Sequence, residues 1–312
     1  MTREKRIFCC GNIAYDLVIE DVNSEGGFSI QACPGGSVFN TSLLLARLGL
    51  DVAVIARLGE DFLSNGLREV MRKENISTRY IETDEHIKTS LAVASIDKKG
   101  DSSYIFYSNA GHEIAVSLKK NIFSDFSEGS VFHTGSAFSY SDHSFESALK
   151  LAQKAAEKKM FITYDPNWRE ERISNKKIAV WRVKHFIELA NLLKLSDSDA
   201  MGITREKTLS SALKKLPSKT VLTMGKKGSL FWDGKKSLHC PAVKVKVVDT
   251  IGAGDGFTAG LLARYCLLEE TSFWAKMPEN LEFASNIAGM ICSSRGSTSG
   301  LCRSYCASPS RR

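Results

Sequence analysis

Short apolar runs alternate along most of the chain with segments that have helical spacing. The apolar runs predict buried strands at residues 6–10, 52–56, 131–134, 160–164, 192–195, 219–224 and 229–232. Between them apolar residues recur every three or four positions, which predicts helices over residues 38–48, 62–73, 144–158, 184–191, 256–268 and 281–293. Alternating strands and helices are typical of a largely parallel sheet covered by helices, so the pattern predicts an α/β fold.

Two stretches break this alternation, at residues 15–34 and 88–110. Both have strand character without a helix. In the second, apolar runs at 90–96 and 103–107 flank a turn at 98–101, which is the pattern of a hairpin. Hairpins that do not fit a parallel sheet are expected to pair with one another in a small outlying sheet. Such a sheet can cover a site as a lid or join two copies of the chain through an exposed edge.

Composition narrows the class of protein. The 312 residues, 43% hydrophobic and 25% charged, suit one large α/β domain or two smaller ones. The longest apolar runs are too short to span a bilayer, and the first residues lead into a strand rather than a signal-peptide core, so no membrane partner and a cytoplasmic location are expected. The net charge of +7 is spread without a stripe of basic and aromatic residues, which argues against a nucleic-acid partner. The eight cysteines lack a C-x-x-C pair, so we expect reduced thiols.

The most informative chemical feature is the glycine-rich run from Asp249 to Gly256. Valines at 243, 245, 247 and 248 predict an extended approach, and helical spacing follows from Phe257, so the glycines lie where a strand turns into a helix. The first amides of that helix would face a negative group such as a phosphoryl group. Asp255 lies in this turn. Its carboxylate is either a base for an attacking hydroxyl or a helix cap.

Three further groups of polar residues lie where an open α/β sheet places its ligands, beyond the carboxyl ends of strands. Asp16 follows the first strand, Gly35, Gly36 and Asn40 open the helix at 38–48, and the run from Asp165 to Arg169 follows the strand at 160–164. A carboxylate accepts two hydroxyl hydrogen bonds at once, which suits a polyol. Each group taken alone is also compatible with an ordinary loop.

Five motifs occur in a fixed order: Gly35-Gly36 with Asn40, Arg57-Leu58-Gly59-Glu60-Asp61 with Gly66, Asp165-Pro166-Asn167, Thr223-Met224-Gly225-Lys226-Lys227-Gly228, and Asp249-Thr250-Ile251-Gly252-Ala253-Gly254-Asp255. In this order and spacing they resemble the PfkB (ribokinase-like) carbohydrate kinase family, over residues 6–300. The resemblance implies a three-layer α/β/α ribokinase-like fold with a β-sheet lid, in one kinase domain over residues 1–312, with residues 301–312 as a flexible tail. It also implies ATP as the donor and a sugar or nucleoside hydroxyl as the acceptor.

The resemblance carries roles to particular residues. Asp255 corresponds to the catalytic base. The amides of Gly252, Ala253 and Gly254 correspond to the anion hole. The residues that would hold the sugar are Asp16, Gly35, Gly36 and Asn40, and those along the nucleotide are Lys194, Thr223, Gly225, Gly228 and Asn286.

Two metal ions are implied as well. Mg²⁺ would bridge phosphate oxygens, with Asp199 as its nearby acid; the family has an N-x-x-E pattern where this chain has Ser196 and Asp199. A monovalent cation, usually K⁺, would bind beside the anion hole at Asp249, Ile251 and Gly296. The family often has Gly-Ala at the last of these places, whereas Ser297 follows Gly296 here.

The acceptor is less determined. The Asp165-Pro166-Asn167-x-Arg169 run resembles fructokinases and 2-keto-3-deoxygluconate kinases, which adds Arg169 and the hairpin residue Tyr107 to the expected sugar contacts. Those subgroups usually have Arg where this chain has Ser108. A fructokinase-like activity is the first expectation, with 2-keto-3-deoxygluconate kinase, ribokinase and nucleoside kinase as alternatives. An inactive family member that serves as a binding or assembly protein is the alternative of another class, and a homodimer through the lid is expected.

Several other nucleotide-binding classes are excluded. Phe257 occupies the third glycine position of a G-x-G-x-x-G motif, which argues against a Rossmann oxidoreductase. The chain also lacks a G-x-x-x-x-G-K-[ST] loop and the protein-kinase H-R-D and D-F-G signatures. A small-molecule kinase outside those classes remains.

Overall fold

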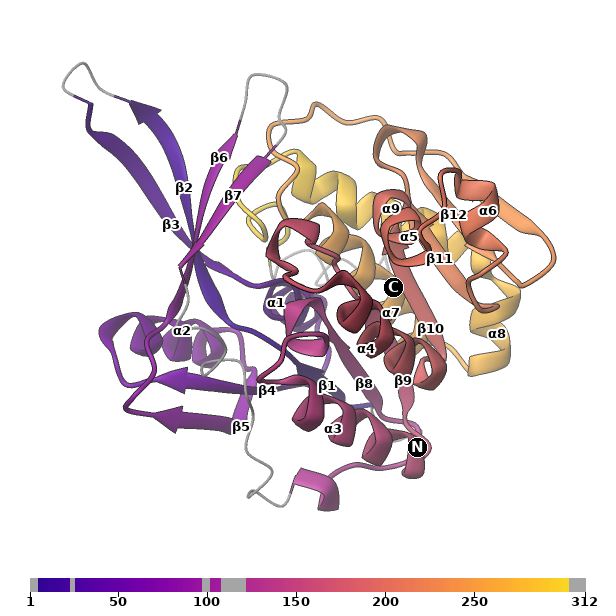
Figure 1. Ribbon diagram of the computed structural model, residues 1–312, viewed down its shortest axis with the longest axis horizontal. Coiled ribbons are helices and arrows are strands. Elements are labelled where there is room, and N and C mark those ends of the chain that lie inside the picture. The colour runs from indigo at the N-terminus through magenta and orange to yellow at the C-terminus, as the bar shows by residue number, and fades with distance from the viewer. Residues whose placement is uncertain (1–4, 23–25, 97–101, 108–121, 303–312) are drawn as a thin grey trace.

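A nine-stranded sheet forms the centre of the molecule in the computed structural model, which describes residues 5–22, 26–96, 102–107 and 122–302. The strand order is β13-β12-β11-β10-β9-β8-β1-β4-β5 (Figure 1). The strands from β11 to β5 in this order are parallel to one another. Strand β12 is antiparallel to both of its neighbours, β11 and β13. Their bounds are β1 Ile7–Cys10, β4 Val52–Gly59, β5 Ser77–Asp84, β8 Val131–Gly135, β9 Phe161–Asp165, β10 Leu192–Ser196, β11 Thr220–Thr223, β12 Ser229–Trp232 and β13 Ser237–Cys240.

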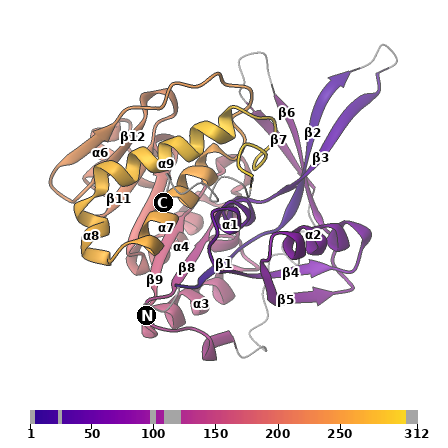
Figure 2. The same ribbon diagram turned by 180° about the vertical axis from the view of Figure 1, so that it is seen from behind.

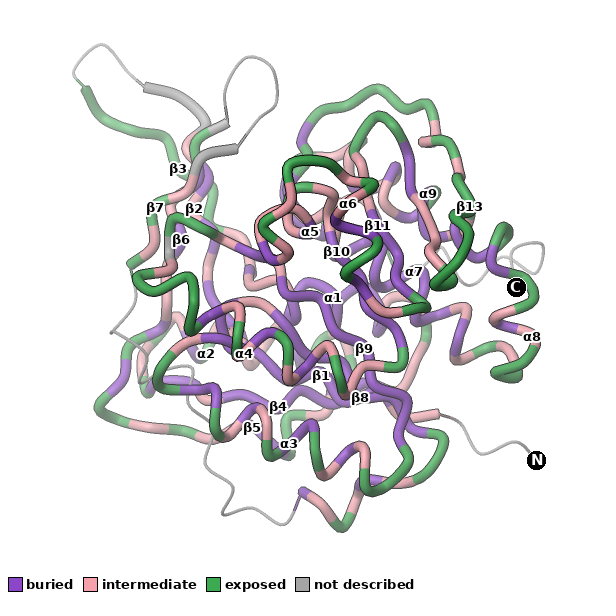
Figure 3. The backbone as a smooth tube through the Cα atoms, turned by 45° about the vertical axis from the view of Figure 1, so that its right-hand side comes forward, coloured by how far each residue is buried: buried purple, intermediate pink, exposed green. Residues whose placement is uncertain are grey.

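Helices cover both faces of this sheet, because successive strand residues point to opposite faces and both sets are apolar. Ile7 and Cys9 pack with α1 (Ser37–Arg47), α2 (Phe62–Lys73), α7 (Ala253–Leu267), α8 (Glu270–Ala275) and α9 (Met277–Cys292). Phe8 and Cys10 pack with α3 (Phe145–Glu157), α4 (Lys176–Leu189), α5 (Asp197–Thr204) and α6 (Leu209–Leu213). Figure 1 has α3 and α4 in front of the sheet, and α1, α7 and α9 come to the front in Figure 2. Figure 3 colours most of the central strands and much of α1 and α7 as buried.

A separate four-stranded sheet, called the small sheet below, projects from one end of the molecule (Figure 1). Its strands are β2 Ala14–Val22, β3 Phe28–Gly35, β6 Ser90–Ile96 and β7 Ser102–Tyr107, in the order β3-β2-β6-β7. Strands β2 and β6 are parallel partners although they come from distant segments. The expected pairing of the two exceptional stretches is therefore confirmed. The expected turn at 98–101 and the tail beyond residue 302 lie outside the described residues.

The predicted sheet and helices are present; the structure adds β13, α5, α6 and α8, and it differs from the prediction at three further places. Helix α4 begins at Lys176 rather than 184, because the Asn175 side chain accepts hydrogen bonds from the amides of Lys177 and Ile178 and caps it there. Strand β5 was not predicted, since only Tyr80 and Ile81 of its residues are buried. Four short 3₁₀ helices complete the described structure: Ile122–Ser124, Ser136–Ser139, Glu170–Arg172 and Gly225–Lys227.

The third difference concerns the extended approach to the glycine-rich run, which is not a strand. Residues 243–248 pair with no strand of the described residues, and the Val248 amide donates to the Cys292 carbonyl at the end of α9. Val245, Val247 and Val248 are partly exposed because they face a cavity rather than the core. Valines and lysines alternate over residues 243–247, and this alternation is also typical of an edge strand, which is why the sequence predicted one here. In the described part of the chain, no helix is both long and apolar enough to cross a membrane.

Candidate active site

A cavity of about 1710 Å³ lies between the small sheet and the carboxyl ends of the central strands. Each of β1, β8, β9, β10 and β11 is followed by residues that line it, as expected for an open parallel sheet. The first turn of α7 and residues 243–248 complete its wall. Three of the residue groups singled out from the sequence, around Asp16, Asp165 and Asp255, line this one cavity although they lie far apart in the chain.

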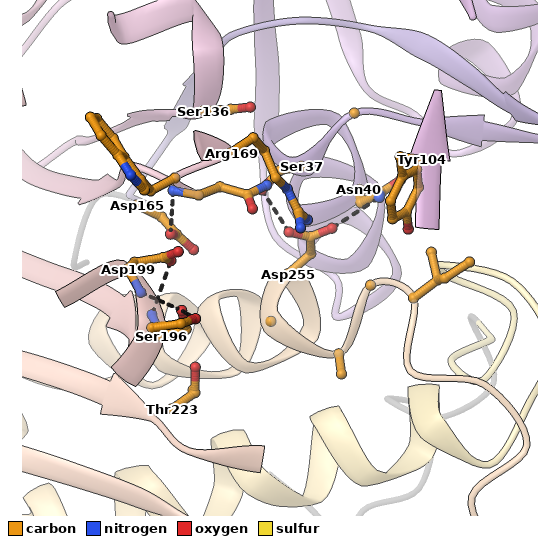
Figure 4. A pocket seen from close by; sticks show the side chains of 18 of the residues that line it. Ser37, Asn40, Tyr104, Ser136, Asp165, Arg169, Ser196, Asp199, Thr223 and Asp255 are labelled. Carbon is orange, nitrogen blue, oxygen red and sulfur yellow. Dashed lines mark hydrogen bonds between the residues drawn. The ribbon is translucent and has the colours of Figure 1, made fainter. Parts of the chain in front are cut away.

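Asp255 lies in the first turn of α7 and is buried. Its carboxylate accepts hydrogen bonds from Ser37 Oγ (2.7 Å) and Asn40 Nδ2 (2.9 Å), both at the start of α1 (Figure 4). Burial raises the pKa of Asp255 to about 6, although these two hydrogen bonds lower it. The N-cap of α7 is Gly252 and has no side-chain cap hydrogen bond, so Asp255 is not a helix cap. A buried carboxylate with a pKa near 6 is suited to act as a base at neutral pH.

The turn before Asp255 needs its glycines for steric reasons. Gly252 has φ 78°, and a Cβ built there would lie 2.1 Å from the Ser297 carbonyl oxygen. A Cβ on Gly254 would lie 3.1 Å from Lys194 Nζ. The Ala253 amide donates to the Thr250 carbonyl at 3.2 Å, whereas the amides of Gly252 and Gly254 have no hydrogen-bond partner among the described residues. Of the three amides predicted to form an anion hole, those of Gly252 and Gly254 are thus available to a ligand, whereas that of Ala253 already donates within the turn.

A second buried acid faces the small-sheet end of the cavity. Asp16, on β2, is next to Gly35, where a Cβ would lie 2.4 Å from the Asp16 Cγ. Gly36 has φ 101° and its Cβ would collide with the Asn12 carbonyl oxygen. Burial raises the pKa of Asp16 to about 7, the charge of Asp255 contributes, and Arg169 opposes the rise. Close packing at both glycines therefore brings Asp16 to the edge of the cavity.

An ion pair lies beneath the first turn of α7. Lys194 Nζ, from β10, donates to Asp165 Oδ2, at the end of β9, at 2.8 Å, and both side chains are almost fully buried. The Thr258 hydroxyl, one turn into α7, also donates to Asp165 Oδ2 at 3.3 Å. Burial lowers the pKa of Lys194, but Asp165 reverses this effect and the net pKa is raised, so the ammonium stays charged. A fixed positive charge therefore lies beside Gly254.

Comparison with known proteins decides the family. A model of the pfkB family carbohydrate kinases matches residues 4–302. The chain belongs to the pfkB family of carbohydrate kinases. The family and enzyme class predicted from the motifs are thereby confirmed.

Relatives of this pfkB kinase agree with that assignment. It is 25% identical over 305 residues to probable fructokinase-3 of Arabidopsis thaliana, covering 92% of this chain and 86% of that one. It is 24% identical to a fructokinase of Vibrio alginolyticus, with 95% of each chain covered. Among solved structures, a fructokinase double mutant of Vibrio cholerae O395 in its fructose-, ADP- and potassium-bound form has a TM-score of 0.84 at 22% identity, with 96% of each chain covered. The aminoimidazole riboside kinase of Salmonella enterica, complexed with aminoimidazole riboside and an ATP analogue, has a TM-score of 0.83 at 23% identity, covering 95% of this chain and 96% of that one. These structures confirm the predicted three-layer ribokinase-like fold.

Tyr107 and Asn286, which the sequence assigned to the sugar and the nucleotide, do not face the cavity of this pfkB kinase. Tyr107 is exposed on the outer face of β7, and Tyr104 and Phe106 line the cavity instead, because alternate strand residues point to opposite faces. Asn286 is exposed on α9 with its side chain bonded to the Glu282 carbonyl, whereas Ser285 and Gly289 line the cavity. Both predictions missed by one position, which on a strand or a helix is enough to change the face.

Arg169 does line the cavity and reaches towards the small sheet. Its guanidinium lies over the Tyr104 ring, 5.5 Å from the centroid (Figure 4). Sequence reasoning missed Ser37, which donates to Asp255, and Asn12, whose buried Oδ1 has no hydrogen-bond partner within the described residues. Asn12 lies two residues beyond the end of β1, and that position is the signal that would have found it.

The other end of the cavity has the predicted glycines. Thr223, Gly225 and Gly228 line it after β11. Gly225 has φ 54° with open space where a side chain would be, so a ligand can approach the backbone. The apolar Val243 and Val245 face this end as well.

The residues predicted to lie near Mg²⁺ and those predicted to bind the monovalent cation differ in their hydrogen bonding. Asp199 lines the cavity, but its carboxylate closes a capping box with Ser196 at the start of α5 (Figure 4). Burial raises the pKa of Asp199 to about 6. The Asp249 carboxylate accepts hydrogen bonds from the amides of Ile251 (2.8 Å) and Gly296 (2.9 Å), so the structure brings these three residues together. Asp249 is buried, and no side-chain cation of the described residues pairs with it.

Proposed function

We propose that this pfkB kinase transfers the γ-phosphoryl group of ATP to a hydroxyl of a small sugar, with fructose as the first candidate acceptor. The observation that carries the proposal is the buried Asp255 carboxylate, which Ser37 and Asn40 orient at the first turn of α7. The fructokinases among the relatives support fructose in particular.

The proposed reaction uses groups that already lie around this turn. The acceptor hydroxyl gives its proton to Asp255 while its oxygen bonds to the γ-phosphorus, and the bond from that phosphorus to the bridging oxygen of ADP breaks. The amides of Gly252 and Gly254 and the nearby Lys194 ammonium would stabilise the charge on the transferred group. The Asp16 carboxylate would accept hydrogen bonds from the sugar hydroxyls, and the Asn40 amide would donate to them.

ATP fits the opposite end of the cavity. The open backbone at Gly225 and the apolar wall of Val243 and Val245 suit a nucleotide, and Thr223 offers a hydroxyl. No cluster of three or more metal-binding side chains occurs among the described residues. Mg²⁺ would therefore be held mainly by phosphate oxygens and water, with Asp199 near it, and would supply positive charge to the phosphates.

A monovalent cation also fits. Asp249 is a buried carboxylate that only backbone amides satisfy within the described residues, and a cation beside Asp249, Ile251 and Gly296 would neutralise it. The potassium-bound form of the Vibrio cholerae fructokinase supports K⁺ as the identity of this cation. Its effect would be to stabilise the turn that precedes Asp255.

The test is turnover with Mg-ATP and a panel of ketohexoses, aldopentoses, sugar acids and nucleosides, with and without K⁺. We expect fructose to be phosphorylated and Asp255→Asn to lower kcat by at least about a thousandfold. Asp233→Asn is the matched control, because Asp233 lies in an exposed turn and its Asn variant still accepts the same backbone hydrogen bonds. No turnover with any acceptor, together with intact sugar binding, would instead favour the inactive binding or assembly protein.

A nucleoside is the second candidate acceptor, and one observation favours it. Tyr104 and Phe106 line the cavity on β7 with their rings 5.7 Å apart and nearly parallel, which gives the small-sheet end an aromatic wall. Such a wall suits a base attached to the sugar. The nucleoside arm of the panel distinguishes the two: Phe106→Leu should raise KM for a nucleoside about tenfold and for fructose much less.

We further propose a homodimer through the outer face of the small sheet. Phe28, Ile30, Ile105 and Tyr107 are exposed large apolar side chains, and the strand registers place them on one face. A second copy of the same face would cover them. Light scattering at micromolar concentration should give a dimer, and Ile105→Lys should give a monomer; a wild-type monomer would refute the proposal.

The free thiols of the described cysteines agree with the expected cytoplasmic location.

A further inference from the structure

Ser297 lies in the loop after α9 and is buried beside the first turn of α7. Its hydroxyl lies 3.2 Å from the Oδ1 of Asn40 and 3.3 Å from the carbonyl oxygen of Pro34, and it donates towards both acceptors. This hydroxyl therefore meets the same Asn40 side chain that donates to Asp255.

The two contacts of Asn40 use opposite ends of one amide. Asn40 Nδ2 donates to Asp255 Oδ2 at 2.9 Å, and Asn40 Oδ1 faces the Ser297 hydroxyl. Rotation of the amide by half a turn would place Oδ1 against the Asp255 carboxylate, where two acceptors repel each other. The Asp255 carboxylate, which only accepts, selects the orientation in which Nδ2 faces it, and the Ser297 hydroxyl holds the amide there by donating to Oδ1.

The backbone around Ser297 is held in place, so its hydroxyl has a defined direction. The Ser297 carbonyl packs against Gly252, and the preceding Gly296 amide donates to Asp249. On the other side, Arg47 donates to the carbonyl oxygens of Thr298 (2.6 Å) and Leu301 (3.2 Å). Backbone contacts on both sides thus fix the loop independently of the serine hydroxyl.

We propose that Ser297 is a positioning residue for the proposed phosphoryl transfer, which acts on Asp255 by fixing the amide orientation of Asn40. The inference rests on the proposed function of Asp255 as the base. Without the hydroxyl, the Asn40 side-chain amide is held, among the described residues, only by its hydrogen bond to Asp255, so Nδ2 meets the carboxylate in a less defined geometry and stabilises its ionised form less. The other charged groups that act on Asp255 are Asp16, Asp165 and Lys194, and all of them stay in place.

The test compares Ser297→Ala with Ser299→Ala. Ser299 lies in the same loop, but its exposed hydroxyl bonds to the Arg295 carbonyl and not to Asn40. We expect Ser297→Ala to lower kcat about tenfold, as for one hydrogen bond to a charged group, and to move the acid limb of the kcat profile to higher pH. Ser299→Ala should match the wild type, and Ser297→Thr, which restores a hydroxyl, should recover most of the loss.

A double-mutant cycle separates this inference from the function on which it rests. In an Asn40→Ala background, Ser297→Ala should leave kcat unchanged and should lower the urea midpoint of unfolding less than it does in the wild type, because only the contact with the Pro34 carbonyl is then lost. An effect of Ser297→Ala that is unchanged in that background would overturn the inference, as would an unaltered pH profile in the single variant. If the wild type phosphorylates no acceptor, the proposed function and the positioning role both fail, while the unfolding cycle still reports on the Ser297 and Asn40 contact.

Discussion

The ion pair between Lys194 and Asp165 should carry a large share of the stability around the site. The perturbation is Lys194→Met, which keeps most of the side-chain volume and removes the charge. Asp165 then remains buried with two weak donors, the Thr258 hydroxyl at 3.3 Å and the Asn167 amide at 3.2 Å. His133 provides no countercharge, because burial lowers its pKa to about 4.

The geometry sets the magnitude. At the Nζ to Oδ2 distance of 2.8 Å the attraction is about 6 kcal/mol for an effective dielectric constant of about 20. Desolvation of both charges offsets much of this in the native pair, but removing only one partner leaves the other charge buried without compensation. Such removals cost about 3–5 kcal/mol of unfolding free energy. Asp165→Asn added to Lys194→Met should restore about 2 kcal/mol or more, because no buried charge remains.

The assay is urea unfolding at pH 7. Lys215→Met is the control, since Lys215 pairs with Glu206 at the surface and should lose less than about 1 kcal/mol. The reasoning is refuted if Lys194→Met loses no more than this control, or if the double variant is no more stable than Lys194→Met. The double variant should still be inactive, because the ammonium beside Gly254 is absent.

Three further predictions follow from the burial and geometry of the site. Because the pKa of Asp255 is about 6, kcat should fall about tenfold per unit below about pH 6; initial rates between about pH 5 and 9 test this, and a flat profile contradicts it. Because the folded-state pKa of Asp16 is raised to about 7, the folded protein binds this proton more tightly than the unfolded chain, so its contribution to stability should fall as pH rises from about 4 to about 7. Asp16→Asn should flatten that part of the Tm profile, and an equal slope in both proteins contradicts the assignment. Gly252→Ala should abolish activity or folding, because its Cβ would collide with the Ser297 carbonyl oxygen. Gly49→Ala is the control: Gly49 has φ 84° and no neighbour within 4 Å, so this variant should lose only about 1 kcal/mol of unfolding free energy in urea. Equal losses in the two variants would show that the collision with Ser297 is not decisive.

Motif order was enough for the family, and periodicity was enough for most of the strands and helices. The apolar runs predicted seven of the nine central strands, most of which are buried on both faces, whereas β5 and β13 were missed because most of their residues are not buried. Tyr107 and Asn286 were assigned to the cavity one position away from residues that line it. Periodicity shows that a face exists, but it does not show which face meets a ligand.

Local spacing and backbone freedom in the sequence predicted the alternating fold, the glycine-rich turn with its acid, and the strand character of the small sheet. Which groups meet Asp255 depends on the packing of distant segments. Ser37 and Asn40 lie 218 and 215 positions away from it, and Ser297 reaches it through Asn40. Hydrogen bonds between side chains so distant in the chain leave no periodic signal, since packing of α1, α7 and the loop after α9 brings them together. The same packing buries Asp255 and Asp16 and raises the pKa of each.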